Sequence, residues 1–137
     1  MSGTRTGGCL CGAIRVEADG QPLGRVECHC AQCRKIAGGG PALLVQFRDA
    51  DFRVTKGAPQ AHETFADSGA AVIRYFCTDC GTPICSRPTR FEGIVVLKAG
   101  VFDSAEEFAP DAVIWTSEAA PDALFSPGAP TYPKGSS

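Results

Sequence analysis

Seven of the eight cysteines in this chain stand in three short clusters, and no other feature constrains its fold as strongly. The clusters are the pair Cys9 and Cys11, the triplet Cys28, Cys30 and Cys33, and the pair Cys77 and Cys80. A structural zinc ion takes four protein ligands, whereas a catalytic zinc ion takes three and keeps one position for water or substrate. Two pairs and one triplet therefore predict one four-cysteine site and one three-cysteine site.

The alternative to metal binding is a set of disulfides, and the sequence disfavours it. Residues 1–8 are polar and lack the apolar stretch of a secretory signal, and no run approaches the roughly 18 apolar residues of a membrane span. We therefore expect a cytoplasmic protein without membrane contact, where thiols stay reduced. The two thiols of a C-x-C sequence are also poorly placed to bridge each other.

Size and charge narrow the class of protein further. The 137 residues suit a single domain over 1–137, with a core at about 7–126 and a mobile tail at 127–137, where Pro, Gly and Ser dominate. The formal net charge is −2, and the basic residues are scattered as singles and pairs. Without a basic stripe, nucleic acid is not an expected partner.

Short apolar runs separated by Gly, Pro and Asp predict a mainly β, antiparallel fold with little helix. Two short helices are expected. One is at 31–37, before three glycines, and the other is at 103–108, where Asp103 is followed three positions later by Glu106. Strands are expected at 13–18, 25–28, 42–47, 52–55, 61–65, 71–76, 83–86, 93–98 and 112–116.

The two cysteine pairs fit a closed structural site. Cys77, Cys80 and Gly81 form a C-x-x-C-G sequence between apolar strand residues, which is typical of two thiolates on a tight turn. Cys9 and Cys11 follow a Gly-Gly turn 66 residues earlier (77 − 11 = 66). We expect the two pairs to meet and to hold the N-terminal strand against the later hairpin.

The triplet is local enough to bind one ion without help. Cys28 and Cys30 share a strand face, and Cys33 lies one turn into the following helix. Three thiolates leave one position for water, a thiol or a carbonyl oxygen, and a thiol bound there would be deprotonated. Because thiolates donate charge to the ion and weaken it as a Lewis acid, thiolate delivery is favoured over water activation. Cys85 or His62 could instead close this site, although a single cysteine in an apolar strand is commonly a small core residue.

Three blocks resemble the glutathione-dependent formaldehyde-activating enzyme/centromere protein V family. They are the sequences G-C-L-C-G-A-I from Gly8, C-H-C-A-Q-C-R-K from Cys28, and F-C-T-D-C-G-T-P from Phe76. Similarity continues at 98–103 and 114–117 and spans about residues 7–126. In this chain Pro121 and Asp122 lead to Ala123, where family members often carry Trp, so the substrate is open to variation.

The resemblance implies a β-tent fold with two zinc ions. It implies Cys9, Cys11, Cys77 and Cys80 as the structural ligands, with Cys28, Cys30 and Cys33 at the second, catalytic ion. The implied activity is that of a carbon–sulfur lyase, which adds glutathione to formaldehyde to give S-hydroxymethylglutathione. A small-molecule thiol such as glutathione is then the expected partner.

Neighbouring residues have two interpretations each. His29 could be a general acid or base, or it could make a hydrogen bond that orients a ligand. Arg34 and Lys35 could bind a glutathione carboxylate, or they could form a solvated helix face. Two other functions remain open: a non-catalytic zinc module for protein partners, and a methionine sulfoxide reductase of type B, for which Cys85 is the one free cysteine.

Overall fold

The computed structural model describes residues 3–135, and their strands form two sheets. A three-stranded antiparallel sheet has the order β1-β2-β5, and a seven-stranded sheet has the order β10-β3-β4-β9-β8-β7-β6. The strands are β1 Thr4–Gly8, β2 Arg15–Asp19, β3 Gly24–Cys28, β4 Ala42–Arg48, β5 Phe52–Lys56, β6 Gln60–Phe65, β7 Ala71–Phe76, β8 Pro83–Pro88, β9 Ile94–Lys98 and β10 Ala112–Ile114. One α-helix, α1 Ala31–Ala37, and three short 3₁₀ turns, η1 Asp49–Asp51, η2 Ala99–Val101 and η3 Thr116–Glu118, complete the elements.

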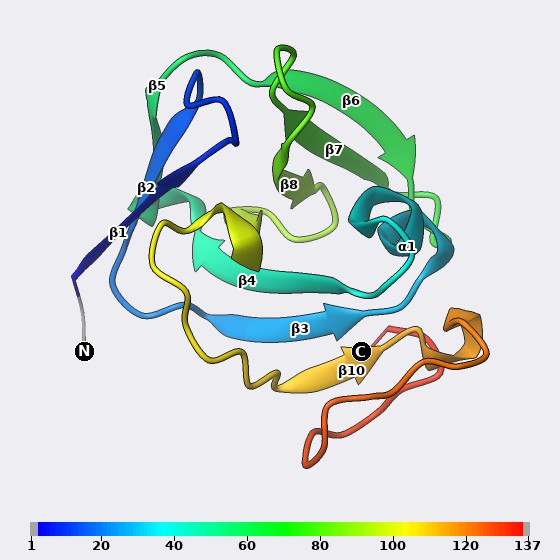
Figure 1. The fold of residues 1–137 in the computed structure, drawn as a ribbon. Helices are drawn as coiled ribbons and strands as arrows, with labels where there is room; N and C mark the ends of the chain where they lie inside the picture. Colours follow the sequence, from blue (N-terminus) through cyan, green and yellow to red (C-terminus); the bar gives the residue numbers. More distant parts are fainter. Residues whose placement is uncertain (1–2, 136–137) are drawn as a thin grey trace.

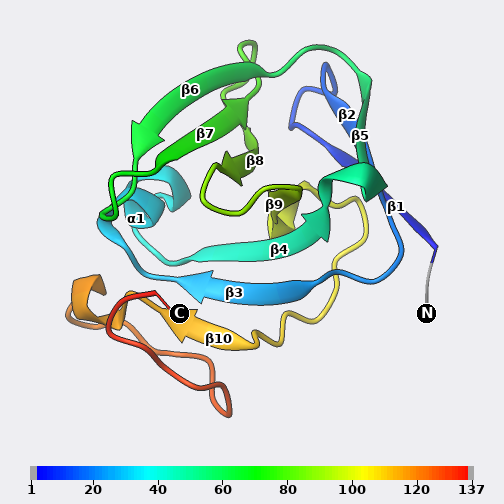
Figure 2. The same ribbon diagram turned by 180° about the vertical axis from the view of Figure 1, so that it is seen from behind.

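The large sheet is strongly bent. Figures 1 and 2 show β6 and β7 lying above β3 and β4, with α1 at one end of the space between them and β1, β2 and β5 at the other end. The arrangement confirms the mainly β, tent-like fold expected from the sequence. All neighbouring strands are antiparallel except β10, which runs parallel to β3.

The main core follows from period-two alternation along the strands. Val45 and Phe47 of β4 and Val95 and Leu97 of β9 point to one face of the large sheet, and all four are buried. Val16, Ala18, Phe52 and Ile84 belong to the same apolar cluster. The small sheet therefore packs against this face, and the other face of the large sheet remains available for a ligand site.

Strand β1 was not expected, because its sequence is polar and ends in two glycines. The strand nevertheless pairs with β2 along its whole length. Its glycine content has a steric reason, since a Cβ at Gly7 would lie 2.2 Å from the carbonyl oxygen of Val101. Gly7 thus allows η2 to approach the strand, at a position where the sequence pattern indicated only a turn.

The helix expected at 103–108 is absent, and the expectation was wrong. The carboxylate of Asp103 accepts hydrogen bonds from Arg15 and from the Thr6 hydroxyl, and Glu106 pairs with Arg5 at 2.8 Å. These acidic groups bind side chains of β1 and β2 in place of the N-terminal amides of a helix. The segment is therefore an extended connection held against the small sheet.

The segment expected to be a mobile tail, 127–137, pairs with β10 over part of its described length. Tyr132 N–H donates to Val113 O at 2.9 Å and Trp115 N–H donates to Lys134 O at 3.0 Å, so this segment runs beside β10. Edge strand β10 offers unpaired backbone groups, and the tail satisfies them. Residues 136 and 137 lie outside the described part of the chain.

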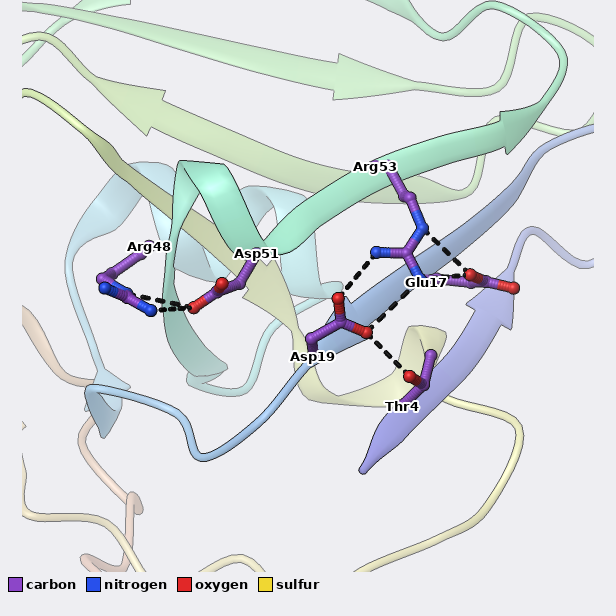
Figure 3. Close-up of polar contacts among 6 residues, drawn as sticks. All are labelled: Thr4, Glu17, Asp19, Arg48, Asp51 and Arg53. Carbon is purple, nitrogen blue, oxygen red and sulfur yellow. Dashed lines mark hydrogen bonds and ion pairs between the residues drawn. The ribbon is translucent and has the colours of Figure 1, made fainter. Parts of the chain in front are cut away.

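The outer face of the small sheet carries a network of ion pairs (Figure 3). Arg53 of β5 contacts Glu17 at 2.6 Å and Asp19 at 2.8 Å on β2, and the Thr4 hydroxyl of β1 donates to Asp19. A separate pair joins Arg48 to Asp51 over three residues. The first network ties together all three strands, whereas the second is local. Within residues 3–135 no helix has the length and apolar character needed to cross a membrane.

Candidate metal centres and their cavity

The four-cysteine cluster forms where two strand connections meet. Cys9 and Cys11 lie between β1 and β2, and Cys77 and Cys80 lie between β7 and β8. The Sγ atoms of Cys9 and Cys11 are 3.6 Å apart, and those of Cys11 and Cys77 are 3.8 Å apart. A tetrahedral zinc ion with Zn–S bonds of about 2.3 Å requires sulfur–sulfur separations of about 3.8 Å. The four thiols therefore fit such an ion.

Polar groups around Cys9 and Cys80 favour the ionised forms of these two thiols. The Ile14 N–H donates to Cys9 Sγ at 3.2 Å, and the Thr82 hydroxyl lies 3.1 Å from Cys80 Sγ. Hydrogen bonds from the Thr82 side chain and backbone lower the pKa of Cys80 to about 5. The Gly81 N–H closes the turn onto Cys77 O at 2.8 Å, and its φ of 77° explains the glycine in the C-x-x-C-G sequence.

The three-cysteine cluster lies where β3 leads into α1. Cys28 is the last residue of β3, Cys30 is the N-cap of α1, and Cys33 is in the first turn. The Cys30 thiol accepts a hydrogen bond from the Cys33 N–H at 3.2 Å, so the helix cap itself fixes two of the sulfurs. All three Sγ atoms lie within 4.8 Å of one another. Hydrogen bonds from Cys28 and Cys33 lower the pKa of Cys30, which favours a thiolate there.

Neither of the two residues considered as a fourth ligand joins this cluster. Cys85 of β8 lies on the core face, opposite Tyr75 and Leu97, and burial raises the pKa of its thiol to about 11. His62 is exposed on edge strand β6. Within residues 3–135 the candidate ligand group at α1 contains Cys28, Cys30 and Cys33 only.

A cavity of about 840 Å³ covers the face of the large sheet that turns away from the core, and the three cysteines line one end of it. Alternation explains the lining, because residues directly opposite one another share a face. Gln46 of β4 is opposite Val96 of β9, which is opposite Ser86 of β8, which is opposite Arg74 of β7, and all four line the cavity. The volume is in the range of small-molecule sites.

His29 does not reach the cavity. Its side chain is 1% exposed, and its Nε2 lies 2.7 Å from Glu27 Oε2. The other oxygen of Glu27 accepts a hydrogen bond from Ser126, and the Phe125 ring packs edge-on against the imidazole. The residue is thus enclosed between β3 and the C-terminal segment.

Arg34 and Lys35 also lie outside the lining of the cavity. The Arg34 Nε donates to the Glu118 carbonyl at 2.8 Å, so this side chain connects α1 to η3, and Lys35 is exposed. The cations that do line the cavity include Arg74 and Lys98, which the sequence analysis did not single out. Lys98 could have been found from its place at the end of an apolar strand. There it is opposite Leu44, which is opposite Val26, and Val26 is two residues before Cys28 on the same strand face.

Comparisons with known proteins agree with this geometry. A model of the family described as glutathione-dependent formaldehyde-activating enzyme matches residues 4–118. A curated protein of Halomonas elongata, named "Putative glutathione-dependent formaldehyde-activating enzyme", is 32% identical over 122 residues, which cover 85% of this chain and 76% of that protein. A crystal structure of a Rhodobacter sphaeroides protein, a structural genomics target, aligns with a TM-score of 0.60 at 20% identity and covers 74% of this chain and 90% of its own. That last likeness concerns the fold alone.

Proposed function

The chain belongs to the glutathione-dependent formaldehyde-activating enzyme family, and from this membership we propose that it is a carbon–sulfur lyase for thiol adducts of small carbonyl compounds. The reference reaction joins glutathione and formaldehyde to give S-hydroxymethylglutathione. In that direction the S–H bond breaks, a C–S bond forms, and the carbonyl π bond opens. The proton released by the thiol ends on the oxygen, so no oxidant or reductant is needed.

We propose zinc at both cysteine clusters, with Cys9, Cys11, Cys77 and Cys80 holding a structural ion. Cys28, Cys30 and Cys33 would hold the second ion, whose fourth position is left to the substrate thiol. Zinc bound there would keep a ligated thiol deprotonated at neutral pH.

The observation that carries the proposal is the position of the three-cysteine cluster at the end of a ligand-sized cavity. The residues of the four-cysteine cluster do not line this cavity. Around the triplet, Leu44, Ile114 and Trp115 pack against the buried cluster of Cys28, Cys33 and Ala42. These side chains exclude water from the reacting sulfur and raise the strength of electrostatic interactions near it.

His29 is proposed here as an orienting residue. Its hydrogen bond to Glu27 and the bond from its backbone N–H to Ile114 O at 3.0 Å fix the backbone between Cys28 and Cys30. The angle between these two ligands depends on that backbone. The imidazole would thus act through the ligands and would not exchange protons with the substrate.

The direct test is Cys30→Ser, assayed with saturating zinc. Exchange NMR with ¹³C-formaldehyde and glutathione measures the enzymatic rate above the spontaneous one. We expect a loss of at least about 100-fold, because the thiolate that caps α1 and completes the triplet is removed. Cys85→Ala, which alters a thiol on the core face, is the matched control and should keep the wild-type rate. An unchanged rate in Cys30→Ser would disprove the assignment.

X-ray absorption of the zinc-loaded protein provides a second test that does not depend on turnover. Two ions per chain are expected, one with four sulfur neighbours and one with three sulfur neighbours and a lighter atom. Addition of glutathione should convert the second to four sulfurs. Four sulfurs at both ions before addition would favour a closed, non-catalytic zinc module.

A further inference from the structure

The cavity carries two cations on its sheet surface, close to the three-cysteine cluster. Lys98 of β9 is directly opposite Leu44 of β4, and Arg74 of β7 is opposite Ser86 of β8. Both side chains line the cavity together with the cysteines. The positive charge of Lys98 acts on all three thiols, and that of Arg74 acts on Cys30. The cations and the cluster therefore belong to one site.

Neither cation is neutralised by a carboxylate. Within residues 3–135 the ion pairs of arginine engage Arg5, Arg15, Arg25, Arg48, Arg53 and Arg87. Among the described residues Arg74 donates a hydrogen bond to the hydroxyl of Thr64, and Lys98 makes no hydrogen bond or ion pair. Of the two carboxylates in the lining, Glu118 accepts from the Ala31 N–H at 2.7 Å, and Asp67 is exposed in the β6–β7 turn.

Two partly buried cations without a counter-charge are costly unless a ligand supplies one. Burial lowers the pKa of Lys98, and Arg74 adds to this effect, while Cys33 and the other thiols oppose it. Zinc at the triplet would cancel two of the three thiolate charges. The one negative charge that remains is less than the two positive charges of Arg74 and Lys98. An anion delivered with the substrate would complete the balance.

We propose that Arg74 and Lys98 form an anion subsite that binds a carboxylate of the thiol substrate while its sulfur reaches the three-cysteine cluster. The inference rests on the proposed function and adds selectivity to it: the enzyme prefers thiols that carry a carboxylate to neutral thiols. In glutathione the glycine end is purely anionic, whereas the γ-glutamyl end also carries an ammonium group. Two cations with no carboxylate beside them match the glycine end.

The test compares the binding of two ligands to the wild type and to two variants, as in a double-mutant cycle. Binding of glutathione and of its glycine ethyl ester to the zinc-loaded protein is followed by the fluorescence of Trp115, the single tryptophan of the chain, which lines the cavity. We expect the wild type to bind the acid about tenfold more tightly than the ester, because a charge-assisted hydrogen bond is lost in the ester. In Lys98→Gln and in Arg74→Gln this ratio should fall towards one, with ester affinity unchanged.

Two further variants separate charge from other effects. Lys98→Arg keeps the cation and should keep the ratio, and Lys35→Gln removes an exposed cation outside the cavity and should do the same. Thermal melting establishes that each variant is folded. A tenfold ratio that survives in Lys98→Gln and Arg74→Gln would overturn the inference, as would equal weakening of both ligands in a folded variant.

The same measurements distinguish failure of the inference from failure of the proposed function. If the wild type turns over the acid and the ester equally well, the lyase assignment stands and the anion subsite falls. If the wild type neither binds glutathione nor accelerates its reaction with formaldehyde, both fall together.

Discussion

The two cysteine clusters offer a metal ion the same kind of ligand, but they differ in their surroundings. The four-cysteine cluster joins two connections that lie 66 residues apart (77 − 11 = 66) and sits beside the main core. The three-cysteine cluster comes from six consecutive positions, 28–33, and opens on the cavity. With the zinc proposed above, the first cluster would be a cross-link between distant parts of the chain, because closing a long loop restricts the unfolded chain. Local origin leaves the second free to serve a ligand.

The largest expected effect is at the four-cysteine cluster. Cys77→Ser should abolish cooperative folding, because a structural zinc site contributes about 10–16 kcal/mol, as much as the whole stability of a typical domain. Circular dichroism melts and zinc content per chain measure the outcome. A variant that melts cooperatively within a few degrees of the wild type would mean that the core alone holds the two sheets together.

The three-cysteine cluster should respond in the opposite way. Cys33→Ser is expected to lose at least about 100-fold in activity with a much smaller change in thermal midpoint, because α1 keeps its cap at Cys30 and its contacts to β4. The same melts and the formaldehyde exchange assay apply. If this variant unfolded as completely as Cys77→Ser, the division between cross-link and reactive site would be wrong.

Cys85 tests whether the eighth cysteine takes part in either cluster. We expect Cys85→Ala to bind zinc in the wild-type amount and to keep its activity, with a loss of about 1 kcal/mol from the vacated space in the core. Denaturant unfolding measures the loss, and metal analysis measures the zinc. A drop in zinc content would place this thiol in a metal site.

The smallest effect concerns the ion pairs of the small sheet. This sheet contains β1 and β2, and the connection between these strands carries Cys9 and Cys11. Arg53→Met should lower the thermal midpoint slightly, and the difference should shrink in high salt because the network is exposed. Arg48→Met removes a local pair and serves as control, with no resolvable change expected. Equal effects of the two substitutions would show that joining three strands adds nothing.

The sequence was sufficient where local spacing carries the information. The grouping of the cysteines, the helix at 31–37 and the apolar run of β9 follow from residue types at fixed intervals, and the structure has each of them. The family resemblance followed from the same three blocks and is confirmed.

The sequence was insufficient where long-range contacts decide the outcome. Asp103 has the pattern of a helix cap, but Arg15, 88 positions away, binds its carboxylate. Arg74 and Lys98 look like ordinary solvent-facing cations of strands, and the pairing of strands distant in sequence places both in the cavity that the cysteines line. The pairing of the C-terminal segment with β10 could not be predicted, because its hydrogen-bond partners cannot be read from its own composition.

Trp115 connects that tail to the cavity. It is the one non-glycine residue within 3–135 with a positive φ, 58°, a backbone state that costs about 1–2 kcal/mol. Its N–H donates to Lys134 O, and its carbonyl accepts from Glu118 N–H at 3.0 Å. These two hydrogen bonds offset the cost of the backbone conformation. Removal of the residues from Thr131 onward, or fusion of a bulky tag at that position, would remove the hydrogen bond to Trp115. The backbone at Trp115 would then change, and with it the shape of the ligand site. Affinities measured on shortened versions of the protein would then describe a different pocket.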